Sequence, residues 1–333
     1  MPQISKMSSG DNLAGKASGS KAIARDRKGR RTAFIIASVV IVLILVIVGV
    51  SLYINAAPFR RIIITVDDTS INMDYFLKRT RLAGADPMEM LEALTDELLI
   101  KVEAPRYVAE VTPQDIDQEL RRVAGGESGT ISESEFKEWY RQVLNEIDLS
   151  DSEYKEIVAT SLLAARLQEY LAERVPPVAE QVHLHSILLD TEDMEKIQEK
   201  WGAGEDMDEL YSEIWLDKES EGAVEDVGWL PRGILASGFD EVAFSLLIGD
   251  VSQPLSYVSD YESEEPFYYL LMVSEKAEAR EIDEEPLQIL KAKALDDWLV
   301  EKWQEKKDEI EWYGLKNGFD SETYAWINWQ LSK

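Results

Sequence analysis

The 333-residue sequence contains no cysteine. A disulfide, a catalytic thiolate and a lipid-modified cysteine are therefore all excluded, and so is any zinc site with thiolate ligands. Histidine is almost as scarce, because His183 and His185 are the only two in the chain. Stability must therefore come from packing, and imidazole chemistry is confined to these two positions.

Basic residues are also in short supply. The chain has 35 Lys and Arg against 64 Asp and Glu, for a net charge of −29. Eight of these basic residues lie within residues 1–32, where only Asp11 and Asp26 oppose them. The rest of the chain is thus strongly acidic and would repel phosphate, which argues against a nucleic-acid partner. Such a charge favours a soluble, self-repelling surface.

One long segment has no charge at all. Residues 33–54 are 22 consecutive uncharged, mainly apolar residues. As a helix they would extend roughly 33 Å, enough for a hydrocarbon core of about 30 Å. Basic residues cluster just before this segment, so the positive-inside rule places the N-terminus in the cytoplasm. We expect a cytoplasmic basic tail at 1–32, a single transmembrane helix at 33–54, and an extracytoplasmic main body at the cell membrane.

The next part of the chain carries repeated helix-start signals. Residues 60–71 are rich in β-branched side chains around an Asp-Asp turn, which predicts a short hairpin. Caps and capping boxes follow. They are Asp86-Pro87, Thr112-Pro113, Ser132 with Glu135, and Ser150 with Glu153. We therefore expect a mostly helical module at 59–178.

Two prolines, Pro176 and Pro177, mark a boundary, after which the pattern reads strand, helix, turn, helix, strand. A helical pattern resumes after Pro286, and this last segment holds five of the nine tryptophans. So much aromatic surface must be buried. We expect 283–333 to pack on the helical module and not on the domain between them, 179–282.

The middle of that domain has a recognisable order of residues. The motifs are Glu225-Asp226-Val227-Gly228-Trp229, Arg232-Gly233, Phe239 with Ala243-Phe244, and Gly249-Asp250-Val251-Ser252-Gln253-Pro254. This order resembles the parvulin (PpiC) family of peptidyl-prolyl cis-trans isomerases. The wider layout, with an anchor, a helical module and a returning C-terminal helix, resembles the SurA and PrsA foldases. The resemblance implies an α+β fold in which a small antiparallel sheet with surrounding helices is inserted into the helical module.

The resemblance also implies a site. Leu235 and Phe239 match the family's apolar substrate pocket, and we expect Asp226 beside them. Laid against the family pattern without gaps, Ser186 and Tyr269 fall on its two histidines. Asp217 falls at or next to its Asp or Cys position. The candidate catalytic residues are therefore Ser186, Asp217 and Tyr269, and both family histidines are replaced.

The two histidines of this chain are displaced from the family position. His185 lies one residue early, which in a strand is the opposite face. A one-residue bulge would return it to the site, and this alternative stays open. We interpret both as side chains on the outer strand face. Two histidines at i and i+2 with no clear third ligand are a weak metal signal, so no metal or cofactor is predicted. The acidic stretch 190–196 lacks EF-hand spacing and is interpreted as a solvated face.

The leading hypothesis is a membrane-anchored extracytoplasmic chaperone or foldase that binds unfolded or proline-containing polypeptides. One alternative is an active prolyl isomerase that uses Ser186, Asp217 and Tyr269 as its polar groups. A second alternative is a membrane-tethered scaffold for one native partner.

Overall fold

The structure, a computed structural model, describes residues 41–51, 53, 56–126, 130–203, 206–257, 267–312 and 319–333. The chain forms two compact units, 1–62 with 72–74 and 63–71 with 75–333. In the first unit, residues 41–51 are helical and exposed. Within the described ranges, no helix is both long and apolar enough to cross a membrane. The predicted tail, and residues 33–40, 52 and 54 of the predicted membrane helix, lie outside the described residues.

The predicted hairpin is present. It consists of β1 (Ile62–Val66) and β2 (Thr69–Asn72), joined by a turn in which Asp67 has a φ of 50°. A short aspartate tolerates this left-handed backbone. The hairpin gains a third strand from the far end of the sequence, β7 (Ile310–Trp312), which pairs antiparallel with β1. The C-terminal segment thus completes a sheet that the early residues begin.

Helices follow the hairpin, and their starts match the predicted caps. They are α2 (Met73–Ala83), α3 (Pro87–Glu103), the 3₁₀ turn η2 (Ala104–Arg106), α4 (Pro113–Gly125), α5 (Glu133–Ile147) and α6 (Asp151–Ala172). Thr112, Ser132 and Ser150 each complete a capping box with the residue three positions later. These local hydrogen bonds satisfy backbone N–H groups that the first helical turn leaves without partners.

In the described part of residues 178–282, here termed the sheet domain, the chain forms four strands and three helices. The strands are β3 (Val178–Leu189), β4 (Glu225–Pro231), β5 (Leu255–Tyr257) and β6 (Phe267–Glu281), and the helices are α7 (Thr191–Ala203), α8 (Met207–Ser220) and α9 (Ser237–Ser245). The sheet is antiparallel, with strand order β4-β3-β6-β5. The predicted α+β class with small antiparallel sheets is confirmed.

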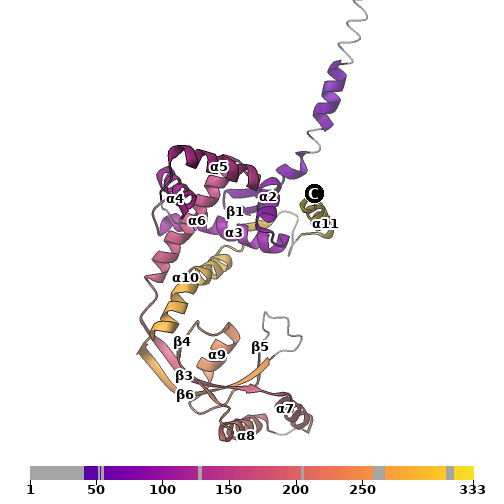
Figure 1. Cartoon of the computed structure of the whole chain (residues 1–333). Helices are drawn as coiled ribbons and strands as arrows, with labels where there is room; N and C mark the ends of the chain where they lie inside the picture. The colour runs from indigo at the N-terminus through magenta and orange to yellow at the C-terminus, as the bar shows by residue number, and fades with distance from the viewer. Residues whose placement is uncertain are drawn as a thin grey trace, which may run out of the picture. The chain divides into compact units, whose positions relative to one another are not determined.

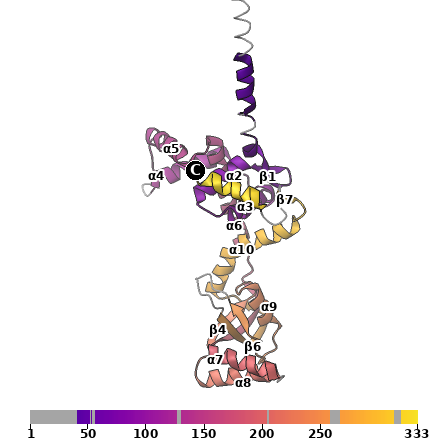
Figure 2. The same ribbon diagram turned by 90° about the vertical axis from the view of Figure 1, so that its right-hand side faces the viewer.

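The two faces of this sheet carry different helices. Val182 and Leu184 of β3 pack in a cluster with Phe244 of α9. Ile187 and Leu189 of the same strand pack against α7 and α8. Figures 1 and 2 show α9 on one side of the sheet and α7 and α8 on the other. These sides are termed the α9 face and the α7/α8 face.

The ammonium group of Lys218 connects α8 to the end of β3 and to the start of α7. Lys218 Nζ of α8 lies 2.7 Å from Asp190 Oδ2 and 2.8 Å from Asp193 Oδ2. Asp190 and Asp193 also accept each other's backbone N–H at the start of α7. Most of the acidic stretch 190–196 is exposed, as predicted, but Asp193 is buried and is neutralised by Lys218 from the neighbouring helix.

Three of the five tryptophans of the C-terminal segment, Trp298, Trp303 and Trp312, contact residues of the early helices, whereas Trp329 is exposed. Trp298, on α10 (Glu284–Glu305), is only 6% exposed and packs in a cluster with residues of α3 and α6. Trp303 Nε1 donates to Asp96 at 2.6 Å, and Trp312 Nε1 donates to Thr95 Oγ1 at 3.0 Å. The chain ends with α11 (Ser321–Leu331), which also contacts α3.

The start of α10 also touches the sheet domain. Lys293 Nζ donates to the carbonyl of Gly233 at 2.6 Å. A side chain added at Gly233 would meet Leu290 at 3.4 Å. The expectation that 283–333 avoids the sheet domain is thus wrong for the first turns of α10. The physical reason is connectivity, because only two residues separate the end of β6 from the start of α10.

Candidate functional site

A mainly apolar cavity of about 300 Å³ opens on the α9 face of the sheet domain. Strands β3, β4, β5 and β6 and the segment that leads into α9 all contribute to its walls. The lining residues are Leu184, Ser186, Glu225, Val227, Leu235, Ala236, Phe239, Tyr257, Tyr269 and Leu271. Its polar groups are few, which is the usual character of a site that binds an apolar group and orients it.

Four of the six predicted site residues meet in this cavity: Ser186, Leu235, Phe239 and Tyr269. The ring of Phe239 lies edge-on to Tyr269, with centroids 6.2 Å apart. Ser186 is 8% exposed and pairs with Leu271 on β6, two residues from Tyr269. Strand alternation thus brings the two hydroxyl residues to the same face of the sheet.

Asp226 does not reach the cavity, because β4 contains a bulge. Leu184 pairs with Gly228 while His185 pairs with Asp226, so Val227 has no partner on β3. Strict alternation from Trp229 would point Asp226 into the cavity and Glu225 away from it. The extra residue exchanges the two, and Glu225 and Val227 line the cavity instead.

Asp217 lies elsewhere too. It belongs to α8, which packs on the opposite face of the sheet, and its side chain is exposed. Its backbone carbonyl accepts hydrogen bonds from Ser220 Oγ and from the N–H of Glu221. The structure therefore separates Asp217 from Ser186 and Tyr269, with which the family pattern had grouped it.

Among the lining residues that were not predicted as site residues, Glu225 and Tyr257 bring a carboxylate and an aromatic ring to the cavity. Glu225 pairs with Ser186 across the strands, so the cavity has one carboxylate directly beside its serine. Gly228, with a φ of +87°, was the signal for the bulge that places it, since glycine within a strand often marks one. Tyr257 comes from the short strand β5, where its ring faces Phe239 edge-on at 6.3 Å.

A half-buried carboxylate, that of Asp240, holds the segment that leads into α9. Asp240 Oδ1 accepts the N–H of Gly233 at 3.2 Å. Burial raises the pKa of Asp240, and the hydrogen bond from Gly233 partly opposes that effect. Gly233 itself has a φ of +87°, which few other residues adopt. This contact fixes the turn from which Leu235 reaches the cavity.

His183 and His185 lie on the α7/α8 face, away from the cavity. The bulge in β4 moves Asp226 and not His185, so the alternative in which a bulge returns His185 to the site is wrong. The two side chains are only 20% and 19% exposed. They are therefore more buried than the predicted surface residues.

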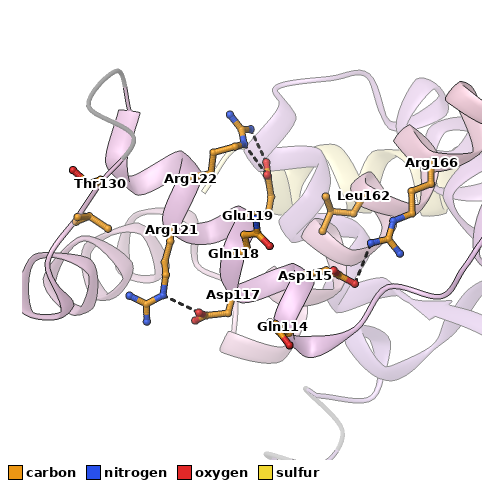
Figure 3. Close-up of a pocket in the computed structure, with 11 residues that line it drawn as sticks. Gln114, Asp115, Asp117, Gln118, Glu119, Arg121, Arg122, Thr130, Leu162 and Arg166 are labelled. Atoms are coloured by element: carbon orange, nitrogen blue, oxygen red, sulfur yellow. Dashed lines mark hydrogen bonds and ion pairs between the residues drawn. The ribbon is translucent and has the colours of Figure 1, made fainter.

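A second, larger hollow of about 780 Å³ lies beside α4 and α6, and its lining is mainly polar and charged (Figure 3). Arg121, Arg122 and Arg166 point in different directions there, and each pairs with a carboxylate of α4. The pKa of Asp115, the partner of Arg166, is lowered chiefly by the backbone N–H of Thr112. The lining residues of this hollow are mainly polar or charged and its arginines are paired, unlike the mainly apolar lining of the cavity on the α9 face.

Comparison with known proteins gives a consistent set of relatives. The foldase protein PrsA of Geobacillus kaustophilus is 26% identical over 199 residues, which cover 59% of this chain and 64% of that protein. The PrsA of Oceanobacillus iheyensis is 26% identical over 198 residues, covering 55% and 64%. The chain is similar to the PrsA foldases. It spans less than two thirds of the length of these curated relatives.

Solved structures of PrsA and SurA-like proteins also align with this chain. The peptidylprolyl isomerase PrsA of Bacillus anthracis is 18% identical, with a TM-score of 0.31, over 66% of this chain and 95% of its own. A structure described for two SurA-like chaperones of Campylobacter jejuni is 13% identical, with a TM-score of 0.26, over 77% and 99%. No family profile matches the chain. The resemblance to the PrsA foldases predicted from the sequence is confirmed by these curated relatives.

Proposed function

We propose that this chain is a membrane-anchored extracytoplasmic folding factor that binds unfolded polypeptides and has little or no prolyl isomerase activity. The observation that carries the proposal is the cavity on the α9 face. It keeps the apolar walls, Leu235 and Phe239, but has Ser186 and Tyr269 at the positions of the family's histidines.

The cavity suits a proline ring or a similar apolar group of an extended chain. Phe239, Tyr257 and Tyr269 present ring edges and faces around it. Aromatic-lined grooves of this kind bind proline-rich segments, which lose little conformational entropy on binding. Binding needs only this apolar surface, so it does not depend on imidazole groups.

Catalysis of isomerisation needs more than the apolar surface that is enough for binding. Rotation about the peptide bond has a barrier of about 18–20 kcal/mol, and a catalyst must stabilise the twisted amide more than the planar one. A hydrogen-bonded pair of imidazoles acts as a unit, so replacing both members should reduce activity far more than a single change. Both histidines of this chain lie on the other face of the sheet, which leaves the cavity without an imidazole.

The proposed anchor is the uncharged segment 33–54. Its described part, 41–51, is helical, and its apolar side chains are exposed within the chain, as expected for residues that contact lipid. The main body would then lie outside the cytoplasmic membrane, where unfolded secreted chains emerge. The division into a helical module with its C-terminal segment 283–333 and an inserted sheet domain is part of the same proposal.

The test compares the wild-type chain with the double variant Ser186→His, Tyr269→His. The cis–trans isomerisation of the Ala-Pro bond of a test peptide, measured by NMR exchange, should be slow with the wild type and faster with the double variant. Suppression of aggregation of an unfolded client protein should be equal for the two. Wild-type exchange as fast as that of the double variant would contradict the loss of isomerase activity.

A second pair of variants tests whether the cavity binds chains. Phe239→Ala removes a wall of the cavity, whereas Leu216→Ala removes an apolar side chain that is 63% exposed on α8. Binding of an unfolded client, measured by fluorescence anisotropy, should weaken for Phe239→Ala and stay unchanged for Leu216→Ala. Equal effects of the two would place client binding outside the cavity.

An active isomerase is the second candidate, and Glu225 favours it. Glu225 pairs with Ser186 across the strands and lines the cavity together with Tyr257 and Tyr269, which gives the cavity a polar set that differs from the family's. Prolyl cis–trans isomerisation that is fast with the wild type and slow with Glu225→Gln would support an active isomerase. Slow exchange in both would support the loss of activity.

A further inference from the structure

We propose that His183, His185 and Asp226 form a binding site for one divalent transition-metal ion of the zinc class. The site lies on the α7/α8 face of the sheet, opposite the cavity. Among the residues described, these three offer ligand atoms that all lie within 4.8 Å of one another. The proposal does not depend on whether the chain is a foldase.

The distances suit a metal ion. His183 Nε2 lies 3.1 Å from Asp226 Oδ1, and His185 Nδ1 lies 3.9 Å from the same oxygen. The ligand atoms of a tetrahedral zinc ion, each about 2.0–2.1 Å from the metal, lie about 3.3 Å apart. The Asp226 side chain is 62% exposed, so it has room to rotate and shorten the longer of these two distances. Two imidazoles and a carboxylate leave a fourth position for water, as in many catalytic zinc sites.

Two bulges build the cluster, one on each side of β3. The bulge at Val227 turns Asp226 toward the histidines. On the other side, His183 pairs with Glu275 and Leu184 with Val273, so Ser274 of β6 has no partner on β3. Ser274 Oγ lies 2.9 Å from His183 Nδ1 and 3.0 Å from His185 Nε2. Bulges that re-aim side chains in this way are common beside functional sites.

For neutral imidazoles, the hydrogen bonds to Ser274 are compatible with a metal ion between the rings and Asp226. Ser274 has one hydroxyl proton, so it can donate to one imidazole at most, and the other must donate to it. If both imidazoles are neutral, at least one then turns a nitrogen lone pair toward the Asp226 carboxylate, which is repulsive. A metal ion there removes the conflict, because both imidazoles then donate to Ser274 and both present lone pairs to the metal. Ser274 Oγ lies 3.4 Å from the carbonyl of His183, which accepts its proton.

The surroundings hold these groups in place. The ring of His183 stacks on Trp229, with centroids 5.3 Å apart and planes at 25°. Asp226 Oδ1 also accepts the N–H of Gly228 at 3.0 Å, which orients the carboxylate. Ser274 occupies the outer position that usually fixes the tautomer of a metal-bound histidine. The strongly acidic chain attracts cations in general, so the test must separate this site from the rest of the surface.

The test uses the full-length chain in a mild detergent, purified without a histidine tag and labelled with ¹⁵N in histidine. Because the chain has only two histidines, each ring nitrogen gives its own signal. Titration with zinc chloride should shift His183 Nε2 and His185 Nδ1 the most, and calorimetry should give one ion per chain. Calcium, which prefers oxygen ligands, should not compete.

Variants locate the site. Ser274→Ala should weaken zinc binding by about 10- to 100-fold. Asp226→Asn, which can still accept the N–H of Gly228, should weaken it at least as much. Asp208→Asn removes an exposed carboxylate of α8 as a matched control and should have no effect. Unshifted ring nitrogens would overturn the proposal and leave a purely hydrogen-bonded cluster. Equal binding by a His183→Gln, His185→Gln variant would also overturn it, by assigning the zinc to the acidic surface.

Discussion

Removing the charge of Lys218 should destabilise the sheet domain. Its ammonium lies between Asp190 and Asp193, and its side chain is 15% exposed. Lys218→Met keeps most of the side-chain length but leaves the Asp193 carboxylate, which is 7% exposed, without its cation. Loss of one partner of a fully buried pair costs about 3–5 kcal/mol. Because Asp190 is 57% exposed and regains water, we expect a loss of about 2–3 kcal/mol.

The assay is amide hydrogen exchange in α7, α8 and β3 of the full-length chain, which reports the opening free energy of this region. The matched control is Lys200→Met. Lys200 pairs with Glu213 between the same two helices, but at 3.6 Å and with more exposure. We expect the control to cost about 0–1 kcal/mol. Equal costs for the two variants would refute the argument that burial of Asp193 decides the effect.

The same contact predicts a pH dependence. The hydrogen bond from Lys218 lowers the pKa of Asp190 from 3.8 to about 2. A carboxyl group with a depressed pKa in the folded state contributes stability above its unfolded pKa and loses it as the pH falls. The contribution should therefore be complete above about pH 4 and disappear toward pH 2. In Lys218→Met this loss between pH 4 and 2 should be much smaller, as acid titration followed by circular dichroism would show.

Three further predictions concern the other parts of the chain. Trp298→Ala should destabilise the helical module by about 3–5 kcal/mol in urea unfolding, and an unchanged midpoint would contradict its burial among α3 and α6. Deletion of 283–333 should unfold the helical module and leave the sheet domain protected in hydrogen exchange, and a surviving helical transition would show that the module does not need this segment. Protease added to intact spheroplasts should digest the region 55–333, whereas protection of that region would reverse the proposed topology.

Local features of the fold were predictable because neighbouring residues determine them. Each capping box needs only a serine or threonine and an acidic residue three positions later, and Ser132 and Ser150 behave accordingly. The turn at Asp67 is likewise local. Cavity residues such as Ser186 and Tyr269 were predicted as a set from the resemblance to the parvulin family, and regular alternation on paired strands explains why the structure brings them to one face.

The predictions that failed, the position of Asp226 and the surroundings of the two histidines, have one physical cause, which is a shift of strand register. A bulge inserts one residue into one strand and exchanges the faces of all that follow, and residue counting does not reveal which residue is left out. Val227 and Ser274 occupy such positions, so the sequence alone placed Asp226 at the cavity and gave the histidines no third ligand. The Lys218 contact was missed for another reason, since it joins residues 28 positions apart through the packing of two helices.

The chain enters and leaves the sheet domain at adjacent points. Val178 pairs with Glu281, and the N–H of Ile282 donates to the carbonyl of Pro177 at 2.8 Å. An inserted domain with neighbouring ends is a transferable cassette, because its removal leaves a gap that a short linker can bridge. Homologous cassettes with intact histidine pairs can therefore replace the sheet domain, residues 178–282, without altering the spacing of α6 and α10. Exchange of the cassette offers a route to adding or removing isomerase activity while the helical module stays constant.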